Sequence, residues 1–108
     1  MKTKEKIRNK FKNDVFERDN HKCLFCGKDA VDAHHIIDRN EMPNGGYVKE
    51  NGISVCEEHH LKCEKYHMSD GKQWDIGFHL NDLYEKIKSS YVIAIVKSKR
   101  LKYLEELK

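Results

Sequence analysis

Two matched pairs of potential metal ligands constrain the fold of this sequence more than any other feature. The first is Cys23-Leu-Phe-Cys26, followed by Gly27, and the second is Cys56-Glu-Glu-His59, which begins 30 positions after Cys26. A Cys-x-x-Cys-Gly turn directs two thiolates toward one point, because the glycine lets the backbone fold back beneath them. Two such pairs offer three cysteines and one histidine to a tetrahedral ion. We therefore expect the chain to fold around one structural zinc.

Two alternatives to this ligand set stay open. A Cys-x-x-Cys pair is also the spacing of thioredoxin-type redox sites, but no helical crossover unit follows Cys26, and the second pair favours metal. Cys63 lies one turn after His59 on the same face of a predicted helix, so it is an alternative fourth ligand. His59 is preferred because it keeps the two-residue spacing.

The composition indicates a small domain with a thin core. At 108 residues the chain is one domain by length, and 36% of its residues are charged, above the roughly 25% usual for globular domains. We expect the metal to supplement its apolar burial. With no apolar run of the roughly 20 residues that cross a bilayer and no signal peptide, the chain is expected to be cytoplasmic and to have no membrane partner.

Basic residues gather at both ends of the chain. Residues 1–13 carry six cations against one acidic residue, and residues 86–108 carry seven against two. This distribution favours a polyanionic partner such as DNA, although lysines also solvate exposed helices. The candidate nucleic-acid contacts are Lys4, Lys6, Arg8, Lys97, Lys99 and Arg100.

Hydrophobic periodicity and turn residues predict the order of the elements. A helix over residues 4–18 is followed by a strand within 30–38, a loop over 39–47, a strand over 52–55 and a helix from about 56 to 68. Residues 80–89 and 91–108 are expected to be helical, with a strand at 92–96 as the alternative. Trp74, Phe78 and the apolar run 91–96 are expected to be buried.

The histidines of the predicted helix 56–68 point in two directions. His60, Glu64 and His67 share one face at i, i+4 and i+7, while His59 lies about 100° away. We therefore expect His59 to face the cysteines and His60 to face the strand that carries His34 and His35. His21, His67 and His79 are expected to be surface or hydrogen-bonding residues.

Three segments of this region together resemble the HNH nuclease family, and in particular its zinc-bearing, phage-type members. These are Asp32-Ala-His34-His35-Ile, Asn51-Gly-Ile-Ser-Val-Cys56 and His59-His60, preceded by the Cys23/Cys26 turn. The resemblance covers residues 15–64. It implies an α+β fold with a ββα-metal (His-Me finger) core at about residues 15–68, a structural zinc knuckle pair and flanking helices. We expect residues 1–108 to form a single HNH nuclease domain, with a basic N-terminal helix (4–18) and a C-terminal helical extension (80–108).

The resemblance also implies roles for the site residues. His35 would be the general base, His34 a metal ligand and His60 a residue that completes the metal site, while Asn51 would hold the loop and orient the base. Spacing adds Glu64 as a third ligand, and Asp32 is an alternative to His34 because it lies on the same strand face. Adjacent strand residues point to opposite faces, so His34 and His35 reach one phosphate only if the strand is bulged or ends there.

These residues predict a metal-dependent DNA endonuclease that hydrolyses phosphodiester bonds. Hydrolysis requires a base for the attacking water and a cation that neutralises charge on the phosphate. A carboxylate ligand favours Mg or Mn, whereas imidazoles accept Ni, Co or Zn. The resemblance makes DNA, and other phage or mobile-element proteins, candidate partners. The alternative function is a non-catalytic, zinc-bound nucleic-acid-binding module.

Overall fold

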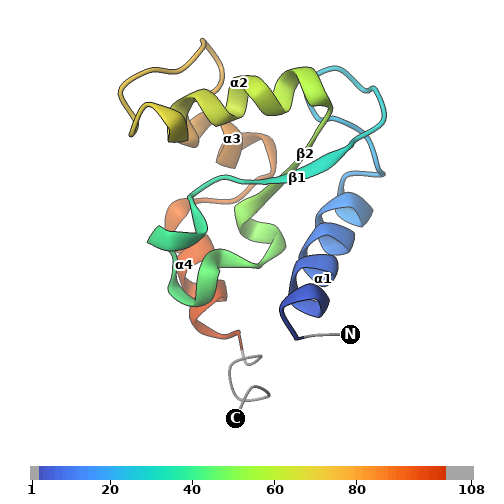
Figure 1. Cartoon of the computed structure of the whole chain (residues 1–108), viewed down its shortest axis with the longest axis vertical. Helices are drawn as coiled ribbons and strands as arrows, with labels where there is room; N and C mark the ends of the chain where they lie inside the picture. Colours follow the sequence, from blue (N-terminus) through green and yellow to red (C-terminus); the bar gives the residue numbers. More distant parts are fainter. Residues whose placement is uncertain (1–2, 102–108) are drawn as a thin grey trace.

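The structure is a computed structural model that describes residues 3–101, a small α+β unit (Figure 1). This part of the chain contains four α-helices and one two-stranded antiparallel sheet. In chain order the elements are α1 (Thr3–Arg18), β1 (Asp32–His35), β2 (Gly52–Val55), α2 (Glu57–Met68), α3 (Leu80–Lys86) and α4 (Tyr91–Lys99). The predicted strand, loop, strand and helix of the central region are confirmed. The predicted helix over 91–108 ends at Lys99, and residues 102–108 lie outside the described part of the chain.

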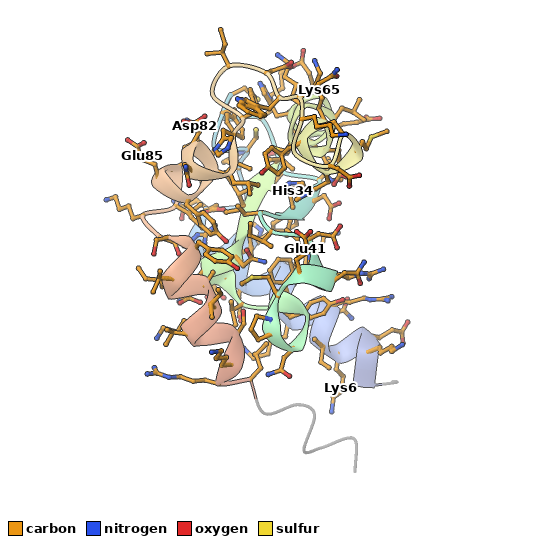
Figure 2. The ribbon with its side chains drawn as sticks, turned by 90° about the vertical axis from the view of Figure 1, so that its left-hand side faces the viewer. Lys6, His34, Glu41, Lys65, Asp82 and Glu85 are labelled. Atoms are coloured by element: carbon orange, nitrogen blue, oxygen red, sulfur yellow. The ribbon has the colours of Figure 1, made fainter. Side chains whose placement is uncertain are left out.

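The sheet lies between α1 and α2, and each strand face meets one of these helices (Figure 1). The register pairs Asp32 with Val55 and His35 with Gly52, without a bulge. Alternation along β1 therefore directs Ala33 toward α1, where it packs in one apolar cluster with Phe11 and Val15. His34, on the opposite face, lies in the interior beside α2, whereas Lys6 and Lys65 project at the periphery (Figure 2).

Close contact between α1 and β2 depends on Gly52. A Cβ atom at this position would lie 2.6 Å from the ring of Phe11 and 2.6 Å from a methyl group of Val15, closer than real Cβ contacts. Polar contacts reinforce the junction, because Arg18 donates to the Gly52 carbonyl at 2.7 Å and Asp19 accepts from the Ser54 amide at 3.0 Å. This junction holds α1 beside the end of β1.

The second apolar cluster lies on the other side of the sheet and includes Ile36, Ile53, Phe78 and Leu83. Phe78 is buried as predicted, but the prediction for Trp74 is wrong, since 44% of this side chain is exposed. The prediction that the run 91–96 is buried is also wrong. This run forms α4, which buries the small residue Ala94 against the molecule and leaves Val92 68% exposed.

No helix among residues 3–101 is long and apolar enough to span a membrane.

Asn51 organises the long connection between β1 and β2. It is fully buried, and both ends of its amide are bonded. Its Oδ1 accepts from the Ile37 amide at 3.1 Å and from the Tyr84 hydroxyl at 2.9 Å, while its Nδ2 donates to the carbonyls of Ile37 at 3.1 Å and Gly46 at 3.3 Å. These bonds connect Asn51 to the start and to the middle of the loop. Asn51 does not line the pocket described below, so an orienting effect on His35 would act through the backbone.

The Asn51→Asp variant should be destabilised by about 2–5 kcal/mol. The substitution replaces the Nδ2 donor with an oxygen that faces two carbonyl oxygens in a buried site, which leaves acceptors unpaired and buries a charge. Chemical denaturation measures the difference. Asn40→Asp is the matched control, because Asn40 is exposed, and its effect should stay within about 0.5 kcal/mol. Equal stabilities of the two variants would contradict this role for Asn51.

Candidate functional site

Three cysteines and one histidine converge between the 23–28 turn and the start of α2. Cys23 and Cys26 lie on a turn closed by hydrogen bonds from the Gly27 amide to the Cys23 carbonyl at 2.9 Å and from the Cys23 amide to the Lys28 carbonyl at 2.7 Å. Gly27 has a φ of 77°, a left-handed conformation that favours glycine. Cys56 is the N-cap residue of α2, and His59 lies in the first turn of that helix.

The four ligand atoms all lie within 4.8 Å of one another. Cys26 Sγ and Cys56 Sγ are 3.7 Å apart, Cys23 Sγ is 3.7 Å from His59 Nδ1, and Cys56 Sγ is 3.1 Å from His59 Nδ1. A tetrahedron with usual zinc bond lengths has edges of about 3.8 Å between sulfurs and ~3.5 Å between sulfur and nitrogen. The cluster Cys23, Cys26, Cys56 and His59 could therefore bind a zinc.

Cys63, the alternative fourth ligand, is not part of this group. Its side chain is fully buried in the apolar cluster beside Ile53 and Leu83. Burial raises the pKa of the Cys63 thiol to about 12, so it stays a neutral thiol that packs in the core. The structure brings His59, the preferred residue, to the cysteines instead.

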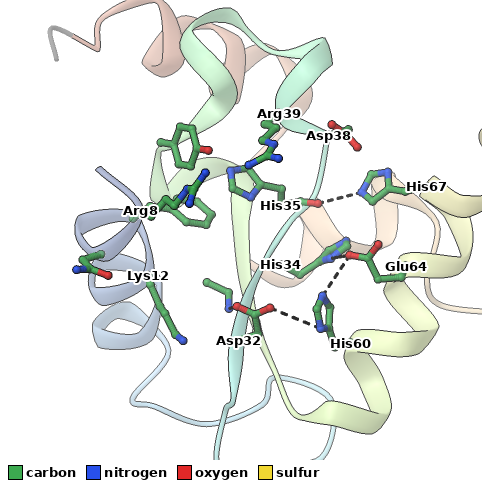
Figure 3. A pocket seen from close by; sticks show the side chains of 14 residues that line it. Arg8, Lys12, Asp32, His34, His35, Asp38, Arg39, His60, Glu64 and His67 are labelled. Carbon is green, nitrogen blue, oxygen red and sulfur yellow. Dashed lines mark hydrogen bonds and ion pairs between the residues drawn. The ribbon is translucent and has the colours of Figure 1, made fainter. Parts of the chain in front are cut away.

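A second group of ligand atoms lies between β1 and α2 (Figure 3). His34 Nδ1 is 3.1 Å from Glu64 Oε1, and His60 Nε2 is 3.2 Å from the same oxygen. The hydrogen bond from His34 lowers the pKa of Glu64 to about 2, and burial lowers the pKa of His34. At neutral pH this gives one carboxylate and a neutral imidazole, the forms that coordinate a cation. His34, His60 and Glu64 could hold a second metal ion.

Asp32, the alternative to His34 as a metal ligand, does not lie with the other ligand atoms. Its carboxylate lies 3.6 Å from His60 Nδ1, on the side of the ring away from Glu64, and it is not among the three converging ligands. Carboxylates commonly fix the ring orientation of a metal-binding histidine from this side. The geometry favours His34 as the ligand and Asp32 as the residue that orients His60.

His35 lies on the opposite face of β1 from His34. Its ring stacks on Phe11 with centroids 4.3 Å apart and meets the edge of Tyr47 at 5.0 Å. Burial lowers the pKa of His35 to about 4, so the imidazole is neutral at pH 7. Its Nε2 is buried and has no hydrogen-bond partner among the described residues, and the same is true of Nε2 of His34. A buried nitrogen without a partner requires an explanation such as a water, an ion or a substrate.

One pocket of about 390 Å³ brings the two histidines together despite their opposite directions. β1 ends at His35. Because the strand ends there, the pocket extends around its end, and both His34 and His35 line it. The pocket is lined by His34, His60 and Glu64 on one side and by His35, Phe11 and Tyr47 on the other.

His67 is a site residue that sequence reasoning did not identify. It lines the pocket, its Nε2 is 3.0 Å from the His35 carbonyl oxygen, and its ring lies 5.1 Å from that of His34. It thus links α2 to the last residue of β1. The sequence feature that indicates His67 as a site residue is its i+7 position after His60, on the helix face that also carries Glu64.

The predicted nucleic-acid contacts separate into two groups. Arg8 lines the pocket, and Lys4 and Lys6 are exposed on the same helix, α1. Lys97, Lys99 and Arg100 are exposed at the end of α4 and do not line it. The pocket also includes two cations that sequence reasoning missed, Lys12 and Arg39.

No family model, curated protein or solved structure matches the chain.

Proposed function

We propose that the chain is a metal-dependent DNA endonuclease of the HNH kind, with its phosphodiester hydrolase site in the pocket at the end of β1. The observation that carries the proposal is the combination on this pocket of three metal-ligating groups and a neutral histidine whose buried nitrogen has no partner. The cations on the same pocket suit a polyanionic substrate.

His35 is the proposed general base. It would accept a proton from water as the water oxygen forms a bond to phosphorus and the bond from phosphorus to the leaving oxygen breaks. Its low pKa keeps the ring unprotonated at neutral pH, so a nitrogen lone pair faces no competing proton there. Stacking on Phe11 and the bond between its carbonyl and His67 hold the residue in place from both sides of the sheet.

His34, His60 and Glu64 are the proposed ligands of the catalytic ion. A divalent ion at this position would neutralise charge on the phosphate and on the leaving oxygen. Two imidazoles and one carboxylate suit Mn, Ni, Co or Zn, and the carboxylate also admits Mg. The three residues occupy only part of the coordination sphere of these ions, so positions stay open for phosphate oxygens and water.

The direct test is cleavage of supercoiled plasmid by protein loaded with one zinc per chain. Nicked or linear product should form when Mg, Mn, Ni, Co or further zinc is added and should not form without an added ion. If none of the five ions produces cleavage while the protein still binds DNA, the chain is the alternative, a zinc-bound nucleic-acid-binding module.

A further inference from the structure

The pocket has two walls of different chemistry (Figure 3). His60, Glu64 and His67 reach into it from α2, and Asp32 adds a second carboxylate on that side. Arg8 and Lys12 reach into it from α1 on the other side of β1. Without a bound cation the carboxylates of the first wall repel a phosphate, whereas the second wall attracts one.

The cations on the α1 wall are available to a ligand. Among residues 3–101, neither Arg8 nor Lys12 forms a salt bridge, and both side chains are exposed. The Lys12 ammonium lies 5.5 Å from the centroid of the Phe16 ring, a contact that does not neutralise its charge. Lys10, on another face of the same helix, is instead paired with Asp14 at 2.8 Å. Arg39, which lines the pocket from the loop side, is hydrogen-bonded to Tyr47 and so is held beside the same wall.

The spacing on α1 defines a stripe. Lys4, Arg8 and Lys12 follow one another at i, i+4 and i+8, so their side chains lie along one face of the helix. Two members of the stripe line the pocket, and the third extends it along the helix away from the sheet. A chain of phosphates that enters the pocket can therefore continue along this face.

We propose that Arg8 and Lys12 form a second phosphate subsite, which holds a phosphodiester neighbouring the scissile one on the same strand. This inference rests on the proposed function, because it assumes that the DNA strand cleaved in the pocket also contacts Arg8 and Lys12. The subsite binds the DNA backbone without a divalent ion. The ligand cluster of His34, His60 and Glu64 is then needed for cleavage and contributes little to binding.

The first test measures DNA binding by zinc-loaded protein in buffer without other divalent ions. A fluorescent duplex is titrated at several salt concentrations with wild type, Arg8→Gln, Lys12→Gln and the double variant. Each single substitution should raise Kd by about tenfold and lower the slope of log K against log salt by about 0.9. Lys10→Gln is the matched control, with the same helix and the same change of charge, and it should leave both quantities nearly unchanged.

The second test compares two substrates in the presence of the activating ion. Bis(p-nitrophenyl) phosphate has one phosphate and cannot occupy two subsites, so the Arg8 and Lys12 substitutions should lower kcat/KM for this substrate much less than for duplex DNA. The same variants should show a KM raised about tenfold for duplex DNA. Zinc content and thermal unfolding confirm that the variants are folded.

The outcomes separate this subsite from the proposed function. Unchanged DNA binding by the double variant would overturn the subsite, and so would an equal loss on both substrates, which would assign the cations to the scissile phosphate. If wild type cleaves neither substrate, the proposed function fails, and the binding measurement still decides the subsite.

Discussion

The Cys23→Ser variant, like the zinc-free wild-type chain, should have no cooperative thermal unfolding transition. A structural zinc contributes on the order of 10 kcal/mol or more of binding free energy to folding, which is comparable to the whole free energy of unfolding of a typical domain, about 5–15 kcal/mol. Here the cluster joins the 23–28 turn to the first turn of α2, and thus fixes the helix that carries His60 and Glu64. Circular dichroism during heating, with zinc content by mass spectrometry, measures the effect.

Cys63→Ala is the matched control for this prediction. Cys63 is a buried cysteine outside the cluster, so its loss should keep one zinc per chain and cost only the packing of a small side chain. A zinc-free wild-type sample that keeps its full transition would refute the structural role of the metal. Loss of zinc from Cys63→Ala would show that His59 is not the fourth ligand.

The His60→Ala variant should lose the second metal ion and all detectable plasmid cleavage but keep the structural zinc. Adjacent histidines of α2 serve different clusters, since His59 Nδ1 lies 3.1 Å from Cys56 Sγ while His60 Nε2 lies 3.2 Å from Glu64. Removal of a partner that only orients a ligand already costs about 10–100-fold in metal affinity, so removal of the ligand should cost at least as much.

Metal analysis of the folded variant after addition of the activating ion gives the stoichiometry. Wild type should contain two ions per chain and His60→Ala one. His21→Ala is the control, because His21 is exposed and belongs to neither cluster. Two ions in His60→Ala would contradict the assignment of the second cluster.

The parts of the fold that follow from local spacing were predictable from the sequence. The knuckle spacing identified Cys23, Cys26, Cys56 and His59, and helical periodicity separated His59 from His60. Both results depend on geometry within one turn or one helix, where residue spacing determines direction.

What depends on packing between distant elements was not predictable. The apolar run 91–96 gave no sign that α4 would bury Ala94 and Ser98 and leave Val92 exposed, because the choice depends on which helix face meets the loop. Asn44 donates to the Ser98 carbonyl from that loop, 54 positions away. Similarly, the approach of α1 that places Phe11 on His35 requires Gly52, which the sequence indicates only as the first residue of a strand.

Plasmid cleavage by the His35→Ala variant tests the central claim most directly. The substitution removes the proton acceptor and leaves the ligands His34, His60 and Glu64 in place, so cleavage should fall by about 10²–10⁴-fold. DNA binding, the second metal ion and the structural zinc should all persist, which shows that the variant is folded and loaded. Cleavage at the wild-type rate would contradict the account, because His35 would then not be the base, and His34 would become the candidate.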